Sequence, residues 1–226
     1  MSRHGSESRM ESAASETAGF VLAGGQSRRM GRDKAVVHLA GRPLIEHALE
    51  ILRDAGLPAC VAGGNPELAA FAPVIQDPHA AQGPLGGICA ALAATHAHFA
   101  VFLPVDLPLL PASLVLTLLQ HASLTGSLVT VPSVNGFVET FPAVLDASIA
   151  PLLERELEDG RRGCLSAFRG AAAGLGRPLS VLPVEFLLQA GQLRDPRGLP
   201  ASRWFLNVNR EDDLARAEIH LRRLIA

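Results

Sequence analysis

The sequence of 226 residues lacks a surplus of positive charge, since its formal net charge is −2 at pH 7. Proteins that hold long nucleic acid usually carry a basic excess, so nucleic acid is not an expected partner. Apolar runs long enough to cross a bilayer are also missing, and the polar stretch Met1–Thr17 has no apolar core typical of a secretory signal. We therefore expect a cytoplasmic protein that contacts no membrane.

Cysteine is scarce as well. Cys60, Cys89 and Cys164 are far apart, no Cys-x-x-Cys pair occurs, and the eight histidines do not cluster with the cysteines. A disulfide framework and a structural zinc site are both disfavoured by this pattern. The scarcity of cysteine fits a reducing compartment.

Hydrophobic residues make up 48% of the chain and charged residues 19%, which is ordinary for a globular protein. Short β-rich runs alternate with helical patterns, and this predicts an α/β fold: a Rossmann-like three-layer α/β/α sandwich with a mostly parallel sheet. The expected strands are residues 19–23, 59–62, 73–75, 100–103 and 180–184, and the expected helices are residues 43–55, 84–96, 111–121, 149–157 and 163–169, with a short helix from residue 66.

Asn135-Gly136 lies between two further β-rich runs, Ser127–Pro132 and Phe137–Leu145. This dipeptide is typical of a tight hairpin turn, so we expect an antiparallel hairpin within the sheet. Residues 1–17 are predicted to form a disordered N-terminal tail, and residues 18–226 a single domain.

The C-terminal part of the chain contains two further signals. The stretch Gln189–Ser202 is rich in Gly, Pro and Arg and is predicted to be a mobile loop. Asn209 precedes an amphipathic pattern and is predicted to cap the final helix.

The most informative segment runs from Leu22 to Lys34 and reads Leu-Ala-Gly-Gly-Gln-Ser-Arg-Arg-Met-Gly-Arg-Asp-Lys. It follows a predicted buried strand, and ligands of open α/β sheets bind beyond the carboxyl ends of strands. Paired glycines allow backbone N–H groups to surround an anion, and the nearby arginines and Lys34 add positive charge. The spacing differs from a Walker A loop and from a dinucleotide-binding fingerprint. We favour a triphosphate site over a solvated glycine turn.

Two aspartates follow predicted strands. Asp106 ends the apolar run Val101–Val105 and stands between Pro104 and Pro108. A carboxylate at this edge suits Mg²⁺, which takes oxygen ligands and bridges substrate phosphates, although a helix N-cap is the alternative. Asp77 precedes Gly83-Pro84-Leu85-Gly86-Gly87 and is either a nucleotide contact or a turn residue.

These motifs together resemble the molybdenum cofactor guanylyltransferase family, within the group of transferases that share the nucleotide-diphospho-sugar transferase fold. The resemblance covers about residues 18–222. It implies an enzyme that transfers GMP from GTP to molybdenum-bearing molybdopterin and releases pyrophosphate, with Mg²⁺ as cofactor. It also suggests molybdoenzymes or cofactor-insertion proteins as partners.

Carried over residue by residue, the resemblance implies three groups of site residues. The catalytic residues would be Arg29, Lys34 and Asp106, with Asp106 also holding the metal. The nucleotide would be bound by Leu22, Ala23, Gly24, Gly25, Lys34, Asp77 and Asp106. The acceptor would be bound by Asn207 and Asn209, from the segment Phe-Leu-Asn-Val-Asn, and by Arg162. Taken alone, Arg161-Arg162 is more typical of a solvated surface pair.

Some positions depart from the family pattern. Gly63-Gly64-Asn65 stands where relatives often have Asn-x-Asn, and Phe141 precedes Pro142 in place of a polar residue. The segment from about residue 185 to residue 203 is longer than the family requires. The alternatives are a cytidylyltransferase or sugar-phosphate nucleotidyltransferase on the same fold, and a non-catalytic GTP-binding module that delivers a cofactor.

Overall fold

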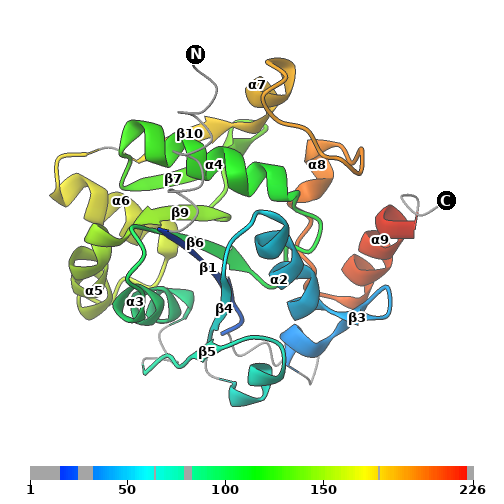
Figure 1. Cartoon of the computed structure of the whole chain (residues 1–226), viewed down its shortest axis with the longest axis horizontal. Helices are drawn as coiled ribbons and strands as arrows, with labels where there is room; N and C mark the ends of the chain where they lie inside the picture. The colour runs from blue at the N-terminus through cyan, green and yellow to red at the C-terminus, as the bar shows by residue number, and fades with distance from the viewer. Residues whose placement is uncertain (1–15, 25–32, 64, 79–82, 178, 223–226) are drawn as a thin grey trace, which may run out of the picture.

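The computed structural model describes residues 16–24, 33–63, 65–78, 83–177 and 179–222 (Figure 1). Its centre is an eight-stranded sheet in the order β10-β7-β9-β6-β1-β4-β5, with β8 paired to β7. The strands are β1 Thr17–Leu22, β4 Ala59–Ala62, β5 Val74–Ile75, β6 Phe99–Pro104, β7 Val129–Val134, β8 Phe137–Val138, β9 Ala143–Asp146 and β10 Ser180–Pro183; β2 His38–Leu39 and β3 Arg42–Pro43 form a separate small sheet.

Helices lie on both faces of the sheet, as Figure 1 shows. The α-helices are α2 Leu44–Asp54, α3 Pro84–Ala94, α4 Ala112–Thr125, α5 Ala150–Glu158, α6 Cys164–Gly174, α7 Val184–Gln189, α8 Ala201–Trp204 and α9 Glu211–Arg222, and the 3₁₀ helices are η2 Lys34–Val36, η3 Pro66–Ala70 and η5 Ala147–Ile149. The predicted elements are confirmed, with shifted ends: α6 runs to Gly174, five residues beyond its predicted end.

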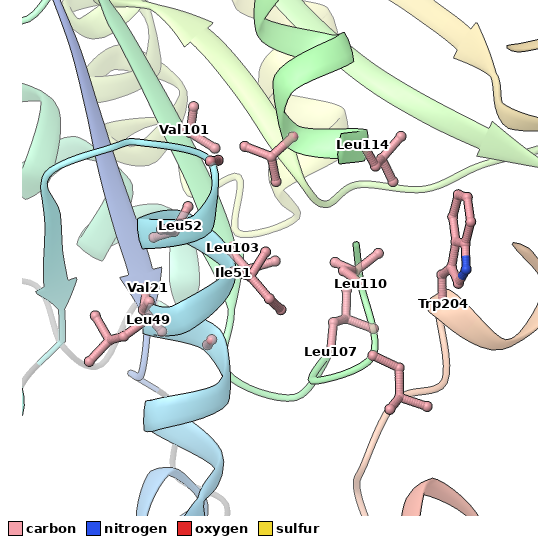
Figure 2. Close-up of a cluster of buried hydrophobic side chains, with 14 of the residues drawn as sticks. Val21, Leu49, Ile51, Leu52, Val101, Leu103, Leu107, Leu110, Leu114 and Trp204 are labelled. Carbon is pink, nitrogen blue, oxygen red and sulfur yellow. The ribbon is translucent and has the colours of Figure 1, made fainter. Parts of the chain in front are cut away.

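The strands alternate between the two faces and so build two cores. Val21 and Val101 face the core under α2 and α4, where Trp204 from α8 is fully buried (Figure 2). Phe20 and Phe102 face the other way, stack with their ring centroids 5.3 Å apart, and pack with residues of α3, α5 and α6. Because residues at i and i+2 of a strand share a face, one apolar run supplies both cores. The predicted three-layer fold is confirmed.

The sheet is mostly parallel, and β9 is the exception in its middle. It pairs antiparallel with β6 on one side and with β7 on the other. The predicted hairpin is confirmed, since Val134 pairs with Phe137 across Asn135 and Gly136, whose φ angles are both positive. Its second strand is shorter than predicted: the run from residue 137 to residue 145 divides into β8 and β9 around Pro142, which has no N–H to give to a strand ladder.

Most of the stretch Gln189–Ser202 is a loop that connects α7 to α8, as predicted, but this loop is anchored to the core. Leu193 and Leu199 are buried in the core that contains Trp204. Arg197 donates hydrogen bonds to the carboxylate of Asp195 and to the carbonyl of Leu109, the latter at 2.5 Å. The prediction of mobility rested on the abundance of Gly, Pro and Arg and did not take account of the two buried leucines that anchor the segment.

The prediction that Asn209 caps the last helix is wrong. The carboxylate of Asp213 accepts hydrogen bonds from the backbone N–H groups of Asn209 and Arg210, both at 3.0 Å, and so satisfies donors at the start of α9. The amide of Asn209 is therefore available for a different contact.

The predicted N-terminal tail lies outside the described residues, except for its last two members. Thr17 already belongs to β1, and the carbonyl of Glu16 accepts a hydrogen bond from the N–H of His98 at 2.7 Å. The helices within the described ranges include none of the length and apolarity that a membrane crossing demands.

Candidate active site

The site lies at the edge of the sheet where β1 and β6 end. These strands are parallel neighbours, with Leu22 opposite Pro104, so the residues that follow them leave the sheet side by side. The N–H of Val105 donates to the carbonyl of Leu22 at 3.1 Å and holds together the segments that follow the two strands. This contact brings the start of the glycine-rich segment, Ala23 and Gly24, next to Asp106.

Lys34 is at the centre of the site. Its Nζ lies 2.8 Å from Oδ2 of Asp106 and 2.5 Å from Oδ1 of Asn209. The side chains of Lys34 and Asp106 are 12% and 23% exposed, so the pair is mostly shielded from water. Lys34 is also the single lysine of the sequence. We call Lys34, Asp106 and Asn209 the rim triad; it joins three segments that are far apart in the chain.

Asp33 fixes the start of the short helix η2 that carries Lys34. Its Oδ1 accepts the N–H of Ala35 at 3.0 Å, as an N-cap does, and its Oδ2 accepts a short hydrogen bond from the amide of Asn65. Asn65 follows β4 and caps η3 by accepting the N–H of Glu67. The helix η2, which carries Lys34, is thus joined through the side chains of Asp33 and Asn65 to the end of a third strand, β4.

The segment Asn207–Asn209 runs beside Asp106. The N–H of Val208 donates to the carbonyl of Asp106 at 2.9 Å, and the side chain of Val208 is buried. Asn207 and Asn209, on either side, are exposed and line the cavity described below. The pattern Asn-Val-Asn therefore follows extended-chain alternation, with the valine in the core and both amides at the site.

A cavity of about 610 Å³ opens over the rim triad. The described residues that line it are Leu22, Ala23, Gly24, Lys34, Pro84, Pro104, Val105, Asp106, Leu107, Glu139, Thr140, Phe141, Arg162, Gly163, Cys164, Asn207 and Asn209. This volume is typical of a site for a small-molecule ligand. The cavity thus brings together nucleotide and acceptor residues predicted from distant motifs.

The two adjacent arginines have different surroundings. Nη1 of Arg161 lies 2.8 Å from a carboxylate oxygen of Glu156 on α5, whereas Arg162 lines the cavity. A Cβ on Gly170 would lie 2.6 Å from that carboxylate, so α6 packs closely over it. Arg161 is therefore held by α5, whereas Arg162 is exposed beside the cavity, where it remains a candidate acceptor contact.

Asp77 is not among the described residues that line the cavity. Its carboxylate covers the first turn of α3, where a Cβ on Gly86 would lie 2.7 Å from Oδ2. A negative charge is favourable at a helix N-terminus. Pro84, at the start of the same helix, does line the cavity. Asp77 thus lies against α3, and its predicted role as a nucleotide contact stays a prediction.

Gly63 stands at the position where the sequence departs from the family pattern. A Cβ there would lie 2.9 Å from the backbone nitrogen of Gly24 and 3.1 Å from the carbonyl carbon of Ala23. The close approach of the β1 and β4 ends therefore requires glycine at residue 63 in this chain.

Sequence reasoning missed Glu139, Thr140 and Cys164. Glu139 and Thr140 fall in the break between β8 and β9, inside the run predicted as one strand, and Pro142 was the available signal for that break. Burial raises the pKa of the Cys164 thiol to about 12, with the neighbouring Cys89 as a smaller cause. Cys164 is therefore an uncharged part of the wall.

Two predicted site residues, Gly25 and Arg29, lie outside the described residues. Within the described part of the chain, no group of three or more His, Cys, Asp or Glu side chains could hold a metal ion by itself. Lys34 contacts Oδ2 of Asp106, and Oδ1 accepts no hydrogen bond from a described residue. One free carboxylate oxygen beside a cavity fits Mg²⁺, which is commonly bound by one or two carboxylates together with substrate phosphates.

Comparison with known proteins identifies the family of this chain. Residues 19–173 match the family described as MobA-like NTP transferase domain. A molybdenum cofactor guanylyltransferase of Xanthomonas euvesicatoria is 48% identical over 46% of this chain and 55% of its own length. One from Cereibacter sphaeroides is 35% identical over 91% of this chain and 97% of its own length.

Among solved structures, molybdopterin-guanine dinucleotide biosynthesis protein A from Archaeoglobus fulgidus superposes with a TM-score of 0.72 at 27% identity, over 91% of this chain and 99% of that one. The family match covers more than half of the chain, and the similarity to the Cereibacter protein extends over nearly all of it. This chain belongs to the MobA-like NTP transferase family.

Proposed function

We propose that this protein transfers GMP from GTP to molybdopterin carrying molybdenum, and thereby forms the guanine dinucleotide form of the cofactor. The observation that carries the proposal is the rim triad, which lies in one cavity with the start of the glycine-rich segment. The relatives at 48% and 35% identity, both named molybdenum cofactor guanylyltransferase, supply the substrate pair.

The nucleotide would bind on the side of the cavity formed by Leu22, Ala23 and Gly24. Glycine at residue 24 leaves backbone open to a ligand, and its close contact with Gly63 fixes the β1 exit against β4. The triphosphate would then extend toward Lys34. Its ammonium group is a compact positive charge that can neutralise phosphate oxygens.

In the reaction, an oxygen of the acceptor phosphate attacks the α-phosphorus of GTP. A new P–O bond forms there, the bond from the α-phosphorus to the oxygen bridging to the β-phosphate breaks, and pyrophosphate leaves. The acceptor phosphate is ionised near neutral pH and needs no strong base, and no histidine is among the described residues lining the cavity. Lys34 would hold the triphosphate in line and neutralise its charge.

Asp106 would hold Mg²⁺ through its free carboxylate oxygen. When bound, the ion supplies further charge neutralisation on the phosphates. Asn207, Asn209 and Arg162 would hold the acceptor phosphate on the opposite side, with the guanidinium contributing charge and two donors in one plane. The residues of this chain thus act by positioning two anions and balancing their charge.

The test is pyrophosphate release with molybdenum-loaded molybdopterin, Mg²⁺ and each NTP in turn. We expect release with GTP and a product that contains guanosine, identified by mass spectrometry. Preference for CTP, or turnover with a sugar 1-phosphate in place of the pterin, would replace the proposal with one of its enzymatic alternatives. Tight GTP binding without pyrophosphate under every condition would indicate a non-catalytic delivery module.

A further inference from the structure

Glu139 is the one carboxylate side chain besides Asp106 among the described residues that line the cavity. It follows β8, and its backbone N–H donates to the carbonyl of Pro132 at 2.9 Å, so the sheet fixes its position. Its side chain is half-buried and forms no hydrogen bond or ion pair with a described residue. Burial raises the pKa of this carboxyl group.

An unpaired carboxylate is unexpected in a cavity that receives two phosphorylated substrates. Like charges repel, and a partly desolvated charge lowers stability unless a partner compensates. Asp106 has Lys34 as its partner, whereas Glu139 has no comparable cation among the described residues. The compensating partner of Glu139 is therefore expected to come from the ligand, as a neutral group that donates hydrogen bonds.

The position of Glu139 in the sheet distinguishes the two substrates. The nucleotide side lies at β1, which packs on β4 through Gly24 and Gly63. Glu139 follows β8, which pairs with β7, and the order β7-β9-β6-β1-β4 puts β7 and β4 on opposite sides of the β1 and β6 ends. In the proposed function the phosphates would meet at Lys34 and Asp106, between these two sides. Glu139 is thus on the acceptor side.

We propose that Glu139 recognises the pterin ring of the acceptor by accepting two hydrogen bonds, one from the ring N3–H and one from the 2-amino group. This inference rests on the proposed function and names the group that selects the acceptor. A carboxylate has two oxygens and can accept two parallel N–H donors. The 2-amino-4-oxo edge of a pterin presents two such donors side by side.

The same chemistry excludes close analogues. A pteridine with oxygen in place of the 2-amino group presents a carbonyl there, which repels the carboxylate. A sugar phosphate has no paired N–H donors. Guanine presents an equivalent edge, but in the proposed function the base would bind at β1, on the other side of the rim triad from β8. Glu139 therefore discriminates between acceptors, and GTP affinity is independent of it.

The experiment is a fluorescence titration of the full chain with 6-hydroxymethylpterin phosphate and with the matched 2,4-dioxo compound, 6-hydroxymethyllumazine phosphate. The wild-type protein is expected to bind the pterin about 10- to 100-fold more tightly, as for hydrogen bonds to a charged group. Glu139→Gln keeps the shape but replaces one acceptor oxygen with a donor, and it should abolish the preference. Glu158→Gln, on the exposed end of α5, is the control and should retain it.

Equal affinity of the wild-type protein for the two compounds would overturn the inference, and so would an unchanged preference in Glu139→Gln. A Glu139→Gln protein with weakened GTP binding and normal pterin binding would also overturn it, because the carboxylate would then contact guanine. The titration requires no turnover. Discrimination without pyrophosphate release would therefore refute the proposed function and support the role of Glu139.

Discussion

The two sides of the cavity differ in how firmly their polar side chains are held. At the rim triad, Lys34 contacts both Asp106 and Asn209, and Asp33 and Asn65 extend this network to β4. On the acceptor side, Glu139 and Arg162 line the same cavity, and their side chains form no hydrogen bond or ion pair with a described residue. The rim triad is organised before a ligand binds, whereas Glu139 and Arg162 keep their polar groups for the ligand.

This difference suggests a division of labour. A preorganised charge arrangement contributes to the transition state because it needs no rearrangement during the reaction. Unpaired groups with fixed backbone positions contribute to substrate choice, since a ligand lacking their complement leaves them unsatisfied. Substitutions in the rim triad should therefore lower turnover, and substitutions of Glu139 or Arg162 should change the affinity for the acceptor.

The largest effect is expected for Asp106→Ala. Loss of this carboxylate removes the proposed metal contact and leaves Lys34 without its anionic partner, so kcat should fall by about 100-fold or more. Pyrophosphate release measures the rate, and thermal unfolding checks that the chain still folds. Asp54→Ala, at the exposed end of α2, is the matched control. Near-wild-type turnover in Asp106→Ala would refute the metal assignment.

Arg162→Ala should act mainly on the acceptor. Removal of a charge-assisted contact is expected to raise the acceptor KM by about 10- to 100-fold while the affinity for GTP stays the same. Arg161→Ala is the matched control, because Arg161 contacts Glu156 instead of the cavity. If the two variants behaved alike, the distinction between the adjacent arginines would be wrong.

Gly63→Ala tests the close approach of β1 and β4. The added Cβ would lie 2.9 Å from the nitrogen of Gly24, so the strand exits must separate. We expect a loss of about 1–3 kcal/mol in unfolding free energy together with weaker GTP binding. Gly174→Ala, whose Cβ would meet Leu152 at an ordinary 3.8 Å, should show neither effect. If GTP affinity were unchanged in Gly63→Ala, the close approach of Gly63 and Gly24 would not be required for nucleotide binding.

The smallest effect is expected from thiol modification. Burial raises the pKa of Cys89 and of Cys164 to about 12, so both thiols stay protonated at pH 8 and react slowly. Labelling of the native protein with iodoacetamide, followed by peptide mass spectrometry, should leave these two cysteines largely unmodified and activity unchanged. Fast labelling of Cys164 with loss of activity would contradict this prediction and would mean that the cavity contains a reactive thiol.

Much of the fold was predictable because its signals are local. Short apolar runs gave the strands, and Asn135-Gly136 gave the hairpin. The insertion of β9 between β6 and β7 was not predictable, since pairing between distant strands leaves no mark in either run. The anchoring of residues 189–202 was missed for a similar reason: Leu193 and Leu199 find their partners only in the folded chain.

In the site, Lys34 and Asp106 were identified from their own sequence patterns and Asn209 from the resemblance, but their contacts were not predicted. Asn209 had a local explanation as a cap, and the structure assigns that role to Asp213. Glu139 had no motif and lay within an apparent strand. Its place in the cavity depends on where the chain breaks between β8 and β9, which is a property of the folded sheet.

The measurement that tests the central claim most directly uses Lys34, the single lysine of the sequence. An amine-reactive acylating reagent can modify only this side chain and the N-terminal α-amine, and the latter serves as an internal reference in the same sample. If the triphosphate binds at the rim triad, GTP with Mg²⁺ at about ten times its Kd should slow Lys34 labelling roughly tenfold and leave the α-amine unaffected. Equal labelling of Lys34 with and without saturating GTP would contradict the account.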